Sequence, residues 1–176
     1  MVDRSERTLK GKLPWLLLAA VMLAADLWSK HSIFEPLQEH QVDWVLGEWF
    51  GFTKVWNKGM MYGALQDFSE ALRWLRVVAA AVVFVMMLTT PARSKLLLLA
   101  LGLVLGGALG NIYDGFQFGA VRDFLIVDFD VKFFDPFPVF NVADSSICVG
   151  VALLALGLLR EDRQAKETSP EMGSGE

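Results

Sequence analysis

Four long apolar runs constrain the fold of this chain more than any other feature. They cover residues 13–34, 72–90, 96–113 and 140–159. A helix that crosses the hydrocarbon layer needs roughly 20 apolar residues, because a rise of ~1.5 Å per residue must cover ~30 Å. The run at 96–113 carries no charged residue, whereas a helix of a soluble bundle needs a polar stripe. The sequence therefore predicts an all-α membrane protein with four transmembrane helices.

Polar segments flank this hydrophobic body. Residues 1–12 form a short lead, residues 13–160 the transmembrane domain, and residues 161–176 a tail that we expect to be disordered. The first apolar run is longer than a usual signal-peptide core and carries Asp26 and Lys30, so we expect it to remain as a span. Cys148 is the only cysteine, which excludes an internal disulfide. Nothing in the charge pattern indicates binding of nucleic acid.

The distribution of basic residues predicts the topology. They gather before the first run, between the second and third runs, and after the fourth run: Arg4, Arg7, Lys10, Lys12, Arg93, Lys95, Arg160, Arg163 and Lys166. Segments rich in Lys and Arg stay on the cytoplasmic side, so both termini are expected to be cytoplasmic. Arg73 and Arg76 lie near the outer end of the second run and oppose this rule, but they are outnumbered. The two longer loops then face outward.

These outer loops show patterns of regular structure. Apolar and charged residues alternate over residues 127–133, which is the period of a half-buried strand. Residues 49–56 are rich in aromatic and β-branched residues and are also typical of a strand. The two strands are expected to pair into a small extracytoplasmic β-sheet at the membrane surface. For residues 38–46 we expect a short interfacial helix.

Polar residues from separate segments are expected to meet in one layer near the outer face of the membrane. They are Asp26, Lys30, Asn57, Asn111, Asp114, Asp123, Asn141 and Asp144. An ionisable group at the bilayer centre costs about 2.5–3.5 kcal/mol on insertion scales, so such groups usually mark a pair, a pathway or a site. Asp26 and Lys30 are four residues apart on one helix face and can form an ion pair. Asn111 and Asn141 could bridge helices through their amides.

Small residues follow the third run. Gly102, Gly106, Gly107 and Gly110 lie at the spacing that lets helices approach closely in lipid. We interpret them as packing residues.

Asp123 and Asp144 are candidates for chemistry. Two carboxylates at the same depth can share one proton, because like charges at short range do not both ionise easily. One can then act as general base on a water while the other, protonated, polarises a carbonyl. This is the chemistry of an aspartyl protease, and it needs no metal, cofactor or nucleophilic Ser or Cys. The alternative is that they are two separate surface aspartates beside lipid headgroups.

Over nearly its whole length, apart from the two tails, the chain resembles the lipoprotein signal peptidase (signal peptidase II) family. The segments that carry the resemblance are Asp26-Leu-Trp-Ser-Lys30, Asn57-Lys-Gly59 with Tyr62-Gly63, Gly107-Ala-Leu-Gly-Asn111-Ile-Tyr-Asp114, Gly119-Ala-Val-Arg-Asp123-Phe124 and Phe140-Asn-Val-Ala-Asp144-Ser. Each segment is weak alone, but five in the right order across four spans are a specific signal.

The resemblance implies an enzyme of the bacterial cytoplasmic (inner) membrane that acts near its outer face. Such an enzyme cuts the signal peptide from a prolipoprotein, before a cysteine that already carries diacylglycerol. The implied partners are lipid-modified prolipoproteins and membrane lipids, and a monomer is expected. By motif, Asp123 and Asp144 are similar to the family's catalytic pair. Substrate-binding or supporting roles are implied for Asn57, Gly59, Asn111, Asn141, Asp26, Lys30 and Asp114.

One position departs from the family pattern. The family usually has Arg directly after the aspartate that corresponds to Asp114, whereas this chain has Gly115. A guanidinium at that place could clamp a carboxylate or a peptide. An alternative hypothesis is therefore a catalytically inactive relative that binds lipopeptides without cutting them. A second alternative, a metal-dependent phosphotransferase acting on lipid headgroups, is suggested by Asp114-Gly115 followed by Arg122-Asp123.

Overall fold

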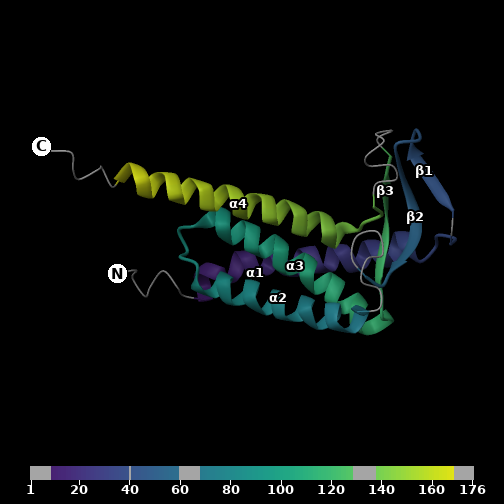
Figure 1. Ribbon diagram of the computed structural model, residues 1–176, viewed down its shortest axis with the longest axis horizontal. Helices are drawn as coiled ribbons and strands as arrows, with labels where there is room; N and C mark the ends of the chain where they lie inside the picture. The colour runs from purple at the N-terminus through teal and green to yellow at the C-terminus, as the bar shows by residue number, and fades with distance from the viewer. Residues whose placement is uncertain (1–8, 40, 60–67, 129–137, 169–176) are drawn as a thin grey trace, which may run out of the picture.

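The computed structural model describes residues 9–39, 41–59, 68–128 and 138–168 (Figure 1). Its helices are α1 (Leu9–Ser29), α2 (Ser69–Thr89), α3 (Lys95–Phe118) and α4 (Val142–Thr168), and a π-helical segment, η2 (Lys30–Phe34), continues α1. The stretches Leu9–Phe34, Ser69–Thr89, Lys95–Phe118 and Val142–Arg160 are long and apolar enough to cross a membrane. The prediction of four helices of membrane-spanning length is confirmed.

Two boundaries differ from the prediction. Helix α1 begins at Leu9, inside the segment assigned to the polar lead. Helix α4 continues to Thr168, so residues 161–168 are helical and not disordered as expected. The reason is composition, because this segment is rich in Glu, Arg, Gln, Ala and Lys, which favour helix even without an apolar face. Residues 169–176 lie outside the described part of the chain.

A three-stranded antiparallel sheet lies at one end of the helices, in the order β1 (Val42–Leu46), β2 (Phe50–Asn57) and β3 (Val121–Val127) (Figure 1). Helix α1 begins and α4 ends at the opposite end. The predicted small sheet is therefore confirmed, and the strand expected at residues 49–56 corresponds to β2.

One expectation for the outer loops needs correction, and another falls largely outside the described residues. The interfacial helix expected over residues 38–46 is wrong, because Val42–Leu46 is strand β1. Its Val and Trp residues favour extended backbone, and Val42 pairs with Thr53 of β2. Strand β3 ends at Val127, where the strand expected over residues 127–133 begins. Residues 129–133, like the Tyr62-Gly63 motif, lie outside the described residues.

The glycines of α3 bring the neighbouring helices close. A Cβ atom on Gly106 would lie 2.6 Å from the carbonyl oxygen of Ala19 in α1, and one on Gly107 would lie 2.5 Å from the carbonyl oxygen of Ala143 in α4. Real side chains do not tolerate such distances, so α3 can occupy this place only with glycine there. Their interpretation as packing residues is confirmed.

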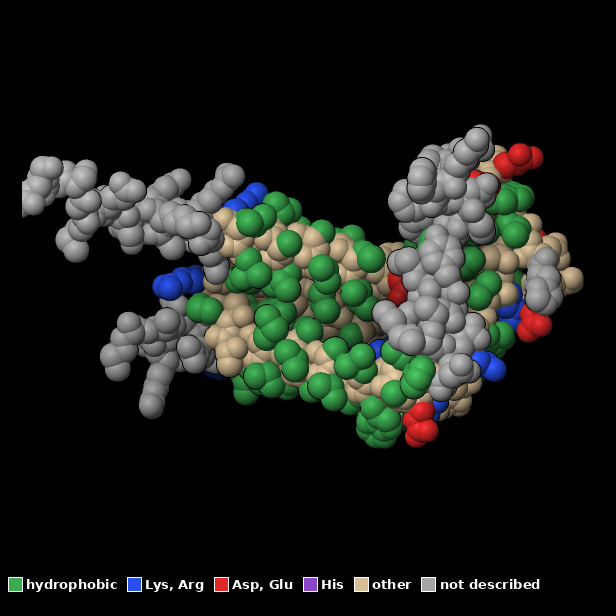
Figure 2. All heavy atoms as spheres, in the orientation of Figure 1, with side chains coloured by type: hydrophobic (Ala, Val, Ile, Leu, Met, Phe, Trp, Pro, Cys, Tyr) green, Lys and Arg blue, Asp and Glu red, His purple; other side chains and the backbone are tan. Residues whose placement is uncertain are grey.

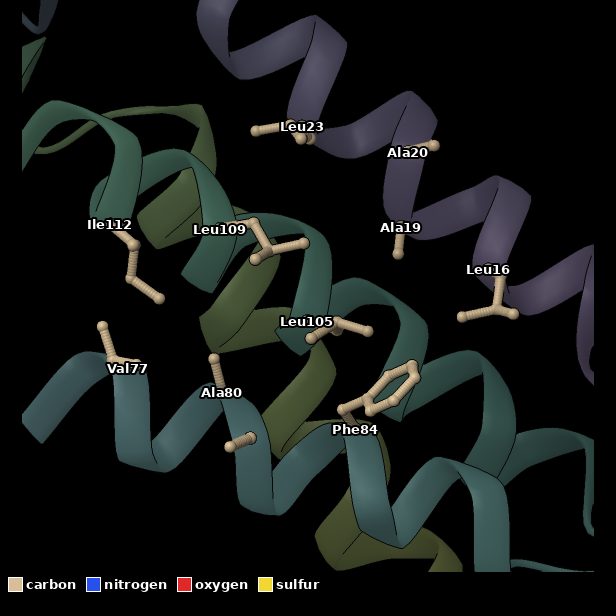
Figure 3. Close-up of a pocket in the computed structure, with 11 residues that line it drawn as sticks. Leu16, Ala19, Ala20, Leu23, Val77, Ala80, Phe84, Leu105, Leu109 and Ile112 are labelled. Carbon is tan, nitrogen blue, oxygen red and sulfur yellow. The ribbon is translucent and has the colours of Figure 1, made fainter. Parts of the chain in front are cut away.

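The outside of the helical body is apolar. Figure 2 shows hydrophobic side chains over the helices and charged side chains towards the two ends. A groove of about 460 Å³ opens between α1, α2 and α3 (Figure 3). Residues that line it include Leu16, Ala20, Val77, Phe84, Leu105 and Leu109. All the residues that line this groove are apolar, so acid–base chemistry has to be sought at the sheet end of the molecule.

Candidate active site

Strand β3 and the start of α4 are tied together by the residue that precedes the helix. The backbone N–H of Phe140 donates to the carbonyl of Leu125 at 3.0 Å, and the N–H of Leu125 donates back to Phe140 at 2.8 Å. Asp123 lies in β3 two residues before Leu125, and Asp144 lies in the first turn of α4. This short bridge therefore brings the two candidate aspartates from separate segments to one place.

Asn141 and Asp144 form a reciprocal cap at the N-terminus of α4. The backbone N–H of Asp144 donates to Asn141 Oδ1 at 2.9 Å, while the backbone N–H of Asn141 donates to Asp144 Oδ2 at 3.2 Å. This is the pattern of a capping box, in which two otherwise unsatisfied helix donors are matched. The cap fixes the direction of the Asp144 carboxylate as well as the start of the helix.

The amide of the same Asn141 also reaches the other aspartate. Its Nδ2 donates to Asp123 Oδ1 at 2.6 Å, and Asn57 Nδ2 donates to Asp123 Oδ2 at 2.9 Å. Asn57 Oδ1 accepts from the backbone N–H of Gly59 at 3.0 Å. The side chain of Asn141 thus contacts both aspartates, and only 2% of Asp123 is exposed.

Asn111 connects Asp144 to a buried cation. Its Nδ2 donates to Asp144 Oδ1 at 2.8 Å, and its Oδ1 accepts from Lys30 Nζ at 3.1 Å and from Asn141 Nδ2 at 3.2 Å. The expectation that Asn111 and Asn141 bridge helices is confirmed. Their side-chain amides donate to one oxygen of each aspartate, Asn111 to Asp144 and Asn141 to Asp123.

Lys30 holds two further carboxylates. Its Nζ lies 2.7 Å from Asp26 Oδ2 and 3.1 Å from Asp114 Oδ2, and all three side chains are fully buried. The predicted Asp26–Lys30 ion pair is confirmed. Asp26 Oδ1 also accepts from the backbone N–H of Ala143 at 2.9 Å, which places a negative charge at the N-terminus of α4. This network joins α1, α3 and α4, and Asn111 connects it to Asp144.

Arg122 faces away from the pair. Neighbouring residues of a strand point to opposite sides, and Arg122 Nη2 donates to Asp114 Oδ1 at 2.8 Å while its Nη1 lies 3.4 Å from Glu35 Oε1. Its guanidinium carbon is 4.5 Å from the centre of the Phe118 ring. Lys30 is therefore engaged with Asp26 and Asp114, and Arg122 with Asp114 and Glu35. The role of Glu35 was missed because it depends on how the outer loop folds.

Burial decides the protonation of Asp123. Removal from water, and after it the nearby charge of Asp144, raises the pKa of Asp123 from 3.8 to about 7. Hydrogen bonds from Asn57 and Asn141 and the charge of Lys30 act in the opposite direction. At neutral pH this carboxyl is thus close to half-protonated, which suits a group that exchanges protons during a reaction.

Every site residue predicted from the sequence lies in this connected network. The structure joins Asp123, Asp144, Asn57, Gly59, Asn111, Asn141, Asp26, Lys30 and Asp114 by hydrogen bonds and ion pairs. Sequence reasoning gave no site role to Arg76 of α2, whose Nη2 donates to the carbonyl of Gly59 at 3.0 Å. The only signal for it was its position at the outer end of a span, where it opposed the charge rule.

Four membrane-length helices with a buried cluster of carboxylates and amides at one end define a multi-pass membrane protein with an acid–base site. Comparison with known proteins gives the family. The model of the family described as "Signal peptidase (SPase) II" matches residues 18–160 of this chain. The chain belongs to the signal peptidase II family, and it is a membrane peptidase of the aspartic type.

Individual relatives agree. A lipoprotein signal peptidase of Ectopseudomonas mendocina (strain ymp) is 39% identical over 163 residues, covering 90% of this chain and 95% of the relative. One from Pseudomonas aeruginosa (strain UCBPP-PA14) is 37% identical over 160 residues, covering 89% and 94%. Two solved bacterial membrane enzyme structures have the same fold. One has a TM-score of 0.79 at 24% identity and covers 90% of this chain and 94% of that one. The other has a TM-score of 0.74 at 25% identity and covers 83% and 92%.

Proposed function

We propose that this peptidase removes the signal peptide from diacylglyceryl-modified prolipoproteins, cutting before the lipidated cysteine, with Asp123 and Asp144 as its catalytic pair. The observation that supports this proposal is that Asn141 donates to both carboxylates, to Asp123 through its side-chain amide and to Asp144 through its backbone N–H. The names of the relatives supply the substrate class.

We assign different roles to the two carboxyl groups. The raised pKa of Asp123 makes it the group that holds the shared proton near neutral pH. Asp144, which accepts from Asn111 and from the backbone of Asn141, is the ionised partner. Asp144 takes a proton from a water as the water oxygen attacks the peptide carbonyl carbon. Asp123 donates its proton to the carbonyl oxygen, which gives a gem-diol intermediate. As the C–N bond breaks, Asp144 passes the proton taken from water to the leaving nitrogen, and Asp123 regains a proton from a hydroxyl of the intermediate.

The surroundings support access from the membrane. The site lies at the sheet end of helices whose outer surface is apolar (Figure 2). In the proposed topology both termini are cytoplasmic and the sheet faces outward in the bacterial inner membrane. A substrate anchored by two acyl chains then reaches the pair sideways from the outer leaflet. We also propose that the enzyme acts as a monomer.

The test is product analysis on the unmutated chain. Purified protein in detergent is incubated with a diacylated prolipoprotein and with the same peptide lacking the lipid, and the products are identified by mass spectrometry. We expect one cut, before the lipidated cysteine, and rates unchanged by a chelator. Binding of the diacylated peptide without any product would instead identify an inactive lipopeptide-binding relative. Loss of activity with the chelator would support the metal-dependent alternative.

A further inference from the structure

Arg76 lies near the sheet end of α2 and is connected to the candidate active site through one short segment. Its Nη2 donates to the carbonyl of Gly59 at 3.0 Å. The N–H of Gly59 donates to Asn57 Oδ1, and Asn57 Nδ2 donates to Asp123 Oδ2. A guanidinium on α2 is thus linked by successive hydrogen bonds to one carboxylate of the proposed pair.

The charge of Arg76 also acts on the pair. Two buried cations near the site, Lys30 and Arg122, form ion pairs with other carboxylates. Arg76 is close enough for its positive charge to interact favourably with both Asp144 and Asp123. The positive charge of Arg73, on the preceding turn of α2, interacts unfavourably with that of Arg76. Arg76 therefore places a positive charge on the α2 side of the site, where Lys30 does not lie.

The space that the guanidinium of Arg76 occupies adjoins a glycine. A Cβ atom on Gly115 would lie 3.5 Å from Arg73 Cγ and 4.0 Å from Arg76 Nη1, which are ordinary contact distances. Gly115 is buried at the end of α3, at the position where the resembling family usually has Arg. A long side chain at position 115 would therefore compete with both Arg73 and Arg76 of α2 for one volume.

We infer that Arg76 is a positioning residue of this enzyme, which supplies from α2 the guanidinium that would otherwise come from position 115. This inference rests on the proposed function of Asp123 and Asp144. The guanidinium holds the carbonyl of Gly59, so that Asn57 stays on Asp123, and its charge keeps one carboxylate of the pair ionised. Gly115 is the residue that gives it room. These roles need both the planar geometry of the guanidinium and its fixed positive charge. Lysine supplies only the charge, so it is an incomplete replacement.

The test compares Arg76→Gln, Arg76→Lys and the double variant Arg76→Gln/Gly115→Arg with a matched control, Arg73→Gln. The control removes a guanidinium from the same helix. The guanidinium carbon of Arg73 lies 5.5 Å from the centre of the Phe116 ring. The kcat, KM and pH–rate profile are measured on a diacylated peptide in detergent, with thermal unfolding as the check of folding. Thermal unfolding is also followed from about pH 5 to about pH 8.

Removal of a positive charge disfavours ionised carboxylates, so Arg76→Gln should move the pH–rate profile to higher pH. Its kcat near pH 6 should fall about tenfold. Arg76→Lys should keep the profile and lose part of kcat/KM, and the double variant should move the profile back towards that of the unmutated chain. Arg73→Gln should behave as the unmutated chain. Unchanged profiles in Arg76→Gln, or equal shifts in Arg76→Gln and Arg73→Gln, would overturn the inference.

Thermal unfolding separates this inference from the proposed function. If the unmutated chain cuts no peptide, the proposed function fails, but the charge of Arg76 still acts on the two carboxylates. The thermal unfolding midpoint of Arg76→Gln should then fall more steeply between about pH 5 and about pH 8 than the midpoint of the unmutated chain. The midpoint of Arg73→Gln should fall as it does in the unmutated chain. The same slope in all three proteins would overturn the role of Arg76.

Discussion

At the scale of single residues, the site depends on buried amides and cations that have hydrogen-bond or ion-pair partners. Lys30 Nζ contacts three acceptors, on Asp26, Asn111 and Asp114. A buried charge without such partners would cost several kcal/mol. Burial of this lysine is therefore possible only because α1 and α3 together supply three acceptor oxygens.

The burial of Asp123 predicts how stability depends on pH. In the folded chain the pKa of Asp123 is about 7, against 3.8 for an ordinary aspartate. Between these values the folded chain binds more protons than the unfolded chain, so stability falls as pH rises through this window. The drop in unfolding midpoint from about pH 5 to about pH 8 should therefore be smaller in Asp123→Asn. Asp43→Asn, on the exposed strand β1, is the control and should keep the full drop. Equal drops in all three proteins would contradict the assignment.

Some residue contacts could be predicted from the sequence and others could not. The Asp26–Lys30 pair follows from helical spacing alone, and Asn141-x-x-Asp144 before an apolar run is a recognisable capping pattern. The convergence of Asp114 on Lys30 needs the relative position of α1 and α3, which no local pattern contains. The inward direction of Arg76 depends on the rotation of α2 about its axis, so the sequence showed only an exception to the charge rule.

At the scale of elements, glycines decide how near the helices lie. A Cβ atom on Gly110 would lie 3.0 Å from the carboxyl carbon of Asp26, with a carboxylate oxygen nearer still. Gly119 has a different role, because its φ of 71° ends α3 in a left-handed conformation and turns the chain into β3.

Gly110→Ala should therefore destabilise the protein by about 1–3 kcal/mol, because the new methyl group displaces Asp26 from Lys30 and from α4. Gly115→Ala is the matched control on the same helix, since its Cβ meets only ordinary contacts. That control should be neutral or gain up to about 1 kcal/mol from helix propensity. Thermal unfolding in detergent measures both changes. A stable Gly110→Ala protein would contradict the packing described for α1 and α3.

The elements also show where sequence patterns were ambiguous. Long apolar runs identify helices reliably, because the bilayer sets their length. Short segments such as Val42–Leu46 carry too few residues for a period to separate strand from helix, and pairing with β2 decided the outcome. Strand β3, which carries Asp123, has no clean alternation because its first four residues are all buried.

At the scale of the whole molecule, the polar network lies at the sheet end and the body of the helices is apolar (Figure 2). This layer could be predicted from the sequence, because membrane-spanning helices of similar length and alternating direction place their ends at common levels. The approach of Asp123 to Asp144 within this layer depends on β3 and on the bridge between Leu125 and Phe140. The sequence did not reveal that bridge.

The most direct measurement is the rate of cleavage of a diacylated prolipoprotein by two single variants, Asp123→Asn and Asp144→Asn. Asp43→Asn, the same substitution on an exposed strand, is the control. Each substitution removes one proton-transfer group of the pair, so each should reduce kcat by about 100-fold to 10,000-fold while the variant remains folded. The control should keep the unmutated rate. A folded Asp123→Asn or Asp144→Asn protein that cuts at nearly the unmutated rate would contradict the proposed mechanism.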